Sequence, residues 1–333
     1  MAGYGDRVML HIGLNPYGLT YVLGLQGAGT PRANPAGRGL EGFVGIAEDL
    51  GARSIELHGP WLLALDAAAL AALRQRLARR GMSVAVGTGY PYARLADIIA
   101  AAGALGARVV RVSLTPVLCG DRHARADWPV LVAGVRTMLE THVKLATQVG
   151  AVLAIENHQD FTAAELVALC EAFGCGICLD TGNAFPVGAA PLDFARLVAP
   201  HVRHVHLKDY RIQFTDEGIR LVRCAIGDGA VPFAELAALL ATDRDLTASL
   251  EPGALEARHV RLLRPEWWQG YAPAPATALA ACLAAARRNR LTDDADWRTP
   301  WERGDDSALV DYELDMMGRS AANMRALGLM GDA

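Results

Sequence analysis

A repeated change in the spacing of apolar residues runs along most of the chain. Segments with helical spacing end at a glycine, and a short run of β-branched or aliphatic residues follows almost at once. The pattern is clearest in residues 49–57, 79–87, 104–113, 148–157 and 172–180. Because glycine readily adopts the left-handed conformation that ends a helix, a short turn can lead directly into a buried strand. The spacing therefore predicts alternating helices and strands.

Three further apolar runs, 7–14, 201–207 and 245–251, complete a set of eight predicted strands. Ala- and Leu-rich segments such as 67–80 and 161–173 lie between strands and have helical periodicity. Eight alternating β/α units within about 250 residues favour one closed parallel barrel over a doubly wound open sheet. We predict an α/β protein with a single (β/α)8 TIM barrel.

Two regions add to a minimal barrel, and we place the barrel domain with the first of them at residues 1–290. Residues 15–39 form a long Gly/Pro-rich loop after the first predicted strand. Loops of this length are commonly functional, and this one leaves the end of a strand where barrel sites are built, so we expect a lid. Residues 291–333 are predicted to form a helical extension, with an amphipathic helix near 307–327. The extension is expected to cover the barrel, complete the pocket or pack on a second subunit.

Composition and charge narrow the functional classes. Of 333 residues, 52% are hydrophobic and 20% charged, which is enough for a large core. The net charge of −4 gives no basic surface for nucleic acid. The first ten residues do not resemble a secretory signal, and no apolar run reaches the ~18 residues of a membrane helix, so we expect a cytoplasmic protein without membrane contact. Cys175 and Cys178 form a CxxC, but we expect buried thiols because no second such pair follows.

Four potential metal ligands fall at the ends of successive predicted strands: Glu156, Asp180, His206 and Glu251. In a parallel barrel these ends open on one face. Three carboxylates meeting there would repel one another unless a cation neutralised them. Oxygen-rich ligation with one imidazole favours Mn²⁺ or Mg²⁺, with Zn²⁺ or Co²⁺ as alternatives. We therefore predict a divalent metal site.

Other polar side chains are placed to act around this site. His158 lies two residues beyond Glu156, where an imidazole could serve as a general base or simply bond to the loop. Lys208 could polarise a substrate oxygen, hold a carboxylate or phosphate, or form a structural ion pair with Asp209. Further substrate-binding candidates lie at or near strand ends: Glu56, His58, Arg111, Asn183 and His204.

The ligand segments also carry a family resemblance. IENHQD (155–160), CLDTGN (178–183), HVHLKD (204–209) and SLEPG (249–253) resemble the xylose-isomerase-like TIM barrels, which include sugar phosphate isomerases/epimerases and the AP endonuclease 2 family. The resemblance implies a divalent metal on Glu156, Asp180, His206 and Glu251, with the two glutamates acting as acid and base in some members. Asn183 departs from the histidine of ketose epimerases and endonuclease IV. The third and fourth predicted strands lack the extra histidines of a three-zinc nuclease, so we disfavour that activity.

Such a site favours removal of a proton next to a carbonyl through a metal-bound enediolate. Residues 258–268 and 311–328, with the long loop, resemble the branch of 3-oxo-isoapionate decarboxylases and C-glycoside deglycosidase large subunits. That resemblance implies His158 as base and lyase-type cleavage of a 3-oxo sugar, by deglycosylation or decarboxylation. The alternatives are a sugar (phosphate) isomerase or 3-epimerase, and a non-catalytic metal- and polyol-binding subunit. We expect a carbohydrate substrate and a homo-oligomer, with a small second subunit if the branch assignment holds.

Overall fold

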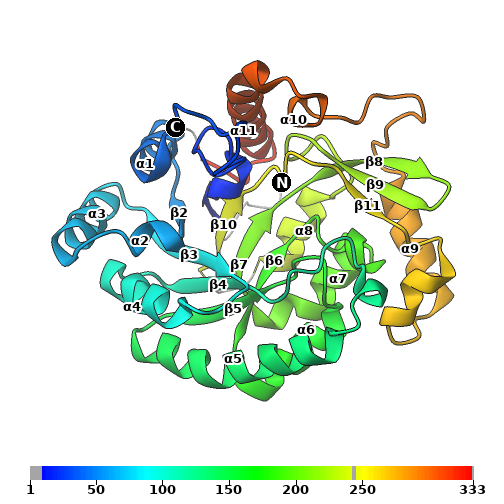
Figure 1. Cartoon of the computed structure of the whole chain (residues 1–333), viewed down its shortest axis with the longest axis horizontal. Coiled ribbons are helices and arrows are strands. Elements are labelled where there is room, and N and C mark those ends of the chain that lie inside the picture. The colour runs from blue at the N-terminus through cyan, green and yellow to red at the C-terminus, as the bar shows by residue number, and fades with distance from the viewer. Residues whose placement is uncertain (1–9, 242–244, 332–333) are drawn as a thin grey trace, which may run out of the picture.

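Eight parallel strands close into a barrel in the computed structural model of the chain, which describes residues 10–241 and 245–331 (Figure 1). Around the barrel the strands follow the order β1-β10-β7-β6-β5-β4-β3-β2. Their bounds are β1 His11–Leu14, β2 Ser54–His58, β3 Ser83–Gly89, β4 Val109–Ser113, β5 Val152–Glu156, β6 Gly176–Asp180, β7 Val202–Leu207 and β10 Thr247–Leu250. The predicted single α/β barrel is confirmed. The start of the first predicted strand and most of the segment searched for a signal lie outside the described residues.

Helices connect the strands and cover the outside of the barrel (Figure 1). They are α1 Gly39–Asp49, α2 Gly59–Leu62, α3 Ala67–Arg79, α4 Leu95–Leu105, α5 Trp128–Gln148, α6 Ala163–Phe173, α7 Pro191–Val198 and α8 Phe233–Leu240. Local signals fix several ends: Thr162 and Glu165 form a capping box at the start of α6. Gly106 and Gly174 end α4 and α6 with φ of 72° each, the left-handed conformation on which the prediction relied.

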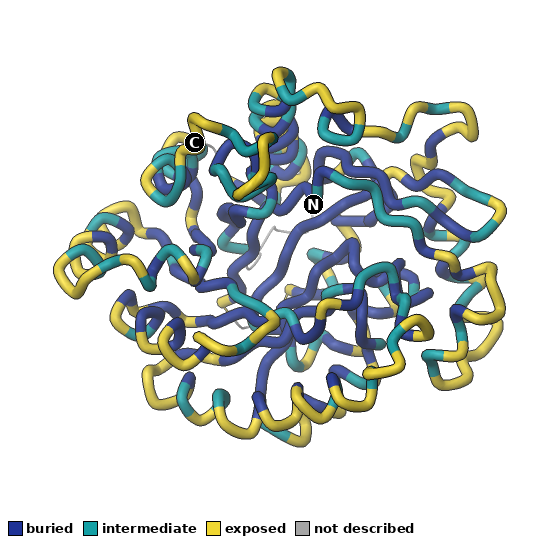
Figure 2. Tube along the Cα trace, in the orientation of Figure 1, coloured by how far each residue is buried: buried dark blue, intermediate teal, exposed yellow. Residues whose placement is uncertain are grey.

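The core divides into two parts by the alternation of strand side chains. Outward residues pack against the helices, and Figure 2 shows the strands as buried while the outer sides of the helices are exposed. Inside the barrel, Ala85, Val109, Ala154 and Cys178 form a small apolar cluster. Cys175 and Cys178 are both buried and free, as expected. The strand register places the buried polar residues Glu56, Arg111 and His204 beside members of this cluster, so the barrel interior is partly polar.

A three-stranded antiparallel sheet beside the barrel was not predicted. It consists of β8 Tyr210–Thr215, β9 Gly218–Arg223 and β11 Arg258–Val260, in the order β11-β9-β8. The first two strands form a hairpin between β7 and α8, and β11 follows β10. The alternation in YRIQFT and GIRLVR around the Asp216–Glu217 turn is a usable hairpin signal. Figure 1 shows this sheet next to α9, at the side of the barrel.

The C-terminal region contains α9 Ala276–Ala286, α10 Pro300–Arg303 and α11 Leu309–Ala326. Helix α11, close to the predicted 307–327, packs against β10, and Arg325 donates to the carbonyl of Leu50 after α1. Glu313 on α11 accepts hydrogen bonds from the backbone N–H groups of Tyr21 and Val22, both at 2.9 Å. The last helix is thereby joined to the loop after β1. The domain boundary at residue 290 stays a prediction.

Replacing Glu313 with alanine is expected to lower the free energy of unfolding by about 3 kcal/mol, because buried donors lose their acceptor. Besides the two N–H groups, the hydroxyl of Thr20 donates to Glu313 at 3.1 Å. Thermal and urea denaturation would measure the loss. Asp311→Ala, an exposed acid on the same helix, is the control and should change stability by less than about 0.5 kcal/mol. Equal stability of the two variants would contradict the anchoring role.

Candidate active site

The structure brings the four predicted ligands together at one end of the barrel. Glu156 ends β5, Asp180 ends β6, His206 lies in β7 and Glu251 directly follows β10. One potential ligand atom from each lies within 4.8 Å of the others, and all four residues are buried. Their convergence follows from the register, which pairs His206 with Asp180 on one side and with Ser249 on the other.

Positive side chains surround this ligand group. The ammonium of Lys208 lies 2.5 Å from both Asp180 Oδ2 and Glu251 Oε1. Burial opposes the charge on Lys208, but the two carboxylates outweigh it and hold the pKa of Lys208 well above its usual range. Burial likewise opposes charge on His206, yet Cys178 and the carboxylates of Glu56 and Glu251 raise its pKa well above the ordinary value. The carboxylates of this group therefore strongly stabilise positive charge near them.

A divalent cation would neutralise these carboxylates, and the available donor atoms are of a kind that such ions bind. Three carboxylates and one imidazole supply oxygen-rich ligation of the kind that Mn²⁺ and Mg²⁺ accept. Among the described residues, no hydrogen-bond donor is assigned to the buried Glu251 Oε2, although it lies 3.0 Å from His206 Nδ1. A buried carboxylate oxygen without a donor is costly unless another group binds it. The residues present thus fit a metal ion.

Glu56 on β2 orients His206 from beneath the ligand group. Its Oε2 lies 2.6 Å from His206 Nε2, and its Oε1 accepts from Arg111 Nη2 at 2.8 Å. Because a carboxylate only accepts, His206 Nε2 donates a hydrogen bond to Glu56, and Nδ1 is the nitrogen that would bind a cation after losing its own proton. Nδ1 lies 3.2 Å from Glu156 Oε1 and 3.0 Å from Glu251 Oε2. The imidazole is thus turned with Nδ1 toward the other ligands.

Replacing Glu56 with glutamine is expected to weaken Mn²⁺ binding by about 10- to 100-fold, because the amide no longer fixes the tautomer and angle of His206. Isothermal titration with Mn²⁺ would measure the change. Asp97→Asn, which alters an exposed carboxylate paired with Arg94, is the control. Unchanged Mn²⁺ affinity in the Glu56 variant would contradict a positioning role.

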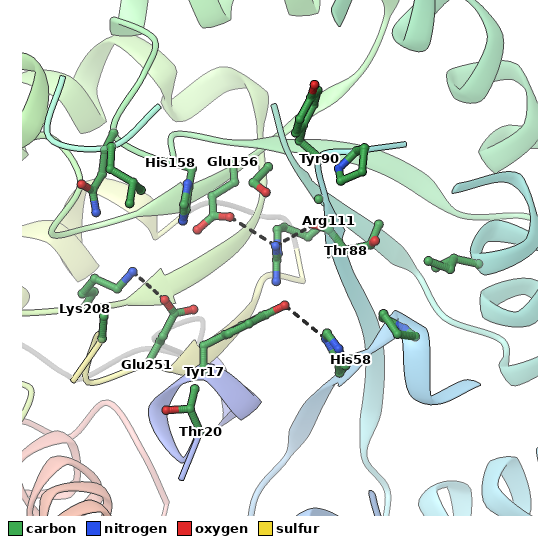
Figure 3. Close-up of a pocket in the computed structure, with 18 of the residues that line it drawn as sticks. Tyr17, Thr20, His58, Thr88, Tyr90, Arg111, Glu156, His158, Lys208 and Glu251 are labelled. Carbon is green, nitrogen blue, oxygen red and sulfur yellow. Dashed lines mark hydrogen bonds and ion pairs between the residues drawn. The ribbon is translucent and has the colours of Figure 1, made fainter. Parts of the chain in front are cut away.

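A cavity of about 650 Å³ opens over the ligand group. Glu156, His158, Lys208 and Glu251 line its polar side, and Figure 3 shows them facing a common space with Tyr17 and Arg111. The opposite wall is more apolar and includes Pro60, Leu63, Tyr90, Leu95 and Ile98. This volume lies within the range of sites that enclose small organic molecules. The cavity is large enough for a sugar derivative.

The loop after β1 contributes directly to the cavity wall. Tyr17 lies in the short 3-10 helix Pro16–Gly18, and its hydroxyl is 3.1 Å from His58 Nδ1. Thr20 and Gln26, further along the loop, also line the cavity. Sequence reasoning foresaw the loop over the site but not Tyr17, because nothing local to the sequence shows the direction of a loop side chain.

His158 lines the cavity, and one of its ring nitrogens has no partner in the described part of the chain. Its Nδ1 is buried and has no hydrogen-bond partner among the residues that the structure describes. Burial lowers the pKa of His158, against the opposing effect of Glu156, so the imidazole is neutral at pH 7. A neutral imidazole with a free lone pair can accept a proton from a bound molecule.

The remaining predicted residues separate into two groups. Arg111 and His58 line the cavity, whereas Glu56, His204 and Asn183 do not. His204 Nε2 lies 3.1 Å from Glu56 Oε2. Asn183 donates from Nδ2 to Asp180 Oδ2 at 2.8 Å. Asn183 thus contacts the ligand residue Asp180, and His204 contacts Glu56. Tyr210 and Arg258, which line the cavity, were not among the predicted residues.

The chain is a closed (β/α)8 barrel with a candidate metal site of carboxylate and imidazole groups at its strand ends. The sequence profile of the family described as xylose isomerase-like TIM barrel matches residues 44–266. The chain belongs to this family, and the family resemblance of the ligand segments is confirmed.

Comparison with individual proteins adds less. The uncharacterized protein YihM of Escherichia coli K12 is 32% identical over 90 residues, which span 26% of this chain and 28% of that relative's length. A xylose isomerase domain protein from Planctomyces limnophilus aligns with a TM-score of 0.50 at 18% identity, covering 65% of this chain and 85% of its own. The probable 3-DHS dehydratase AsbF of Bacillus anthracis aligns with 0.52 at 13% identity, covering 72% and 92%. These two structures share the fold.

Among the described residues, no helix is both long and apolar enough to cross a membrane.

Proposed function

We propose that the protein is a divalent-metal-dependent enzyme that removes a proton next to the carbonyl of a keto sugar or sugar derivative. The observation that carries this proposal is the position of His158, which lines the same cavity as Glu156 and Glu251 of the ligand group and whose Nδ1 has no hydrogen-bond partner among the described residues. Mn²⁺ is the expected ion, held by Glu156, Asp180, His206 and Glu251. When bound, it supplies a Lewis acid that polarises a substrate carbonyl and makes the neighbouring C–H more acidic.

His158 is the proton acceptor in this proposal. Its neutral imidazole can take a proton at the ring nitrogen that carries none at pH 7. Glu156 is less suited, since its Oε2 lies 3.3 Å from Arg111 Nη1. Burial alone would raise the pKa of Glu156, but Arg111 and His206 outweigh this and hold it well below its usual range. Glu156 therefore remains an anion that serves as a ligand.

Proton donors stand on other sides of the cavity and favour lyase-type cleavage of a 3-oxo sugar. Lys208 keeps its proton because of Asp180 and Glu251. Tyr17 does so because burial raises its pKa. Either group can donate to an oxygen of the substrate or of a departing group. One base and separate donors suit an elimination, in which the proton and the leaving group depart from neighbouring carbons.

The second candidate is a sugar isomerase or 3-epimerase. Glu156 ends β5 and Glu251 follows β10, and β6 and β7 lie between these two strands in the barrel. Two carboxylates on different sides could remove a proton from one face of a carbon and return it to the other. The same ligand residues would serve both reactions.

Proton NMR in D₂O with Mn²⁺ would test the proposal on a panel of ketoses, inososes and 3-oxo-glycosides. Deuterium entering next to the carbonyl together with a new epimer or isomer would support the second candidate. Release of an aglycone or of CO₂ from a 3-oxo compound would support the lyase. Absence of exchange in every sample would contradict the proposal and favour a metal- and polyol-binding role, with a partner subunit as the next component to add.

A further inference from the structure

Arg258, the first residue of β11, lines the cavity without a partner for its charge. Within the described part of the chain, no carboxylate lies within 4.0 Å of its guanidinium nitrogens, and no hydrogen bond to its side chain is present. Its Nε is buried. A guanidinium always carries its proton, so a buried donor of this kind is costly unless something accepts from it.

The neighbouring basic residues show that this surface is not short of carboxylates. Arg261 lies 3.4 Å from Glu217 and 3.6 Å from Asp121. Arg264 lies 3.2 Å from Glu217, and the imidazole of His259 lies 3.9 Å from the same carboxylate. Of these four basic residues, only the one that lines the cavity lacks an acidic partner.

The carboxylates in and around the cavity have hydrogen-bond or ion-pair partners other than Arg258. Glu256 also lines it, but its Oε1 accepts from Gln26 Nε2 at 3.0 Å. Glu56, Glu156, Asp180 and Glu251 are the buried carboxylates of the ligand group and its support. Lys208, Arg111 and a divalent ion match those four charges. Arg258 is thus a fixed cation that the catalytic group does not need.

We infer that Arg258 binds an anionic group of the substrate, a carboxylate or a phosphate, while the keto end lies over the ligand residues. This inference rests on the proposed function for the keto end. The planar guanidinium can donate two parallel hydrogen bonds to either anion. Tyr210 and Lys208 line the same cavity as Arg258. The substrate class is therefore an acidic or phosphorylated keto sugar rather than a neutral one.

Three ketoses that differ only at the sixth carbon provide the test: D-fructose, D-fructuronate and D-fructose 6-phosphate. Isothermal titration of the Mn²⁺-loaded protein is expected to show one of the two anions binding about tenfold or more tighter than fructose. Tighter binding of fructuronate identifies a carboxylate, and tighter binding of the phosphate ester identifies a phosphate. Arg258→Gln is expected to remove the tighter binding of the anion. Arg258→Lys is expected to keep part of it, since the positive charge remains but the two parallel N–H donors of the guanidinium are lost.

Arg261→Gln is the matched control, because it lies three residues further along, is partly exposed and pairs with Asp121 and Glu217. It should keep the full preference for the anion. The inference is overturned if neither anion binds better than fructose, or if the preference survives in Arg258→Gln. Deuterium exchange separates the two proposals. Exchange without anion preference removes only this inference, whereas Arg258-dependent anion binding without exchange in any ketose removes only the proposed chemistry.

Discussion

Replacing His158 with glutamine is expected to lower kcat by about 10² to 10⁴-fold, the usual contribution of a positioned general base. Glutamine fills a similar space and keeps polar atoms in the cavity, but it cannot take up a proton at pH 7. The rate of deuterium entry into whichever ketone exchanges with the wild-type protein would measure the loss. Mn²⁺ affinity should be unchanged, since His158 is not among the four ligand residues.

Two results would contradict this assignment. A variant that exchanges deuterium at the wild-type rate would show that another group removes the proton. A variant that loses Mn²⁺ would show that His158 acts through the ion. His123→Gln, at an exposed position in the loop after β4, controls for the substitution itself and should retain full activity.

Glu156→Gln is expected to weaken Mn²⁺ binding by more than about 100-fold and to abolish turnover. The change removes one negative charge from the ligand group and leaves Arg111 facing a neutral amide in place of the carboxylate now 3.3 Å away. Mn²⁺ titration and the deuterium-exchange rate would be measured on the same preparation.

The matched control is Glu140→Gln on the exposed side of α5, which should leave both quantities unchanged. Turnover that persists at the wild-type rate after Mn²⁺ has been lost would contradict a catalytic metal. Loss of turnover with Mn²⁺ affinity intact would instead assign Glu156 a direct part in proton transfer.

The barrel and its ligand group were predictable because both follow from local sequence. A glycine such as Gly106 or Gly174 follows α1, α3, α4, α5 and α6, and the apolar run after it marks a strand. Parallel strands in a closed barrel necessarily bring their ends together, so Glu156 and Asp180 could be placed in one site from spacing alone.

Tyr17 and Arg258 could not be found in this way. Each belongs to a segment after a strand end, where side-chain direction depends on contacts with distant parts of the chain. Tyr17 meets His58, which lies 41 residues away. Arg258 reaches the cavity because β11 pairs with β9, in a sheet that the barrel pattern does not contain. The alternation in β8 and β9 signals a hairpin, but not the third strand that joins it.

The hydrogen bonds between Glu313 and the loop after β1 can form only late in the synthesis of the chain. Thr20 and Glu313 are separated by 293 positions, so the loop that carries Tyr17 emerges long before its anchor. At ribosomal rates of about 5–20 residues per second, that interval is roughly 15 to 60 s. During this period the eight strands can be synthesised, but the loop that carries Tyr17 lacks its hydrogen bonds to Glu313 on α11. The cavity wall that carries Tyr17 is thus anchored only after Glu313 has been made, and a chain that stops before this residue lacks the anchor.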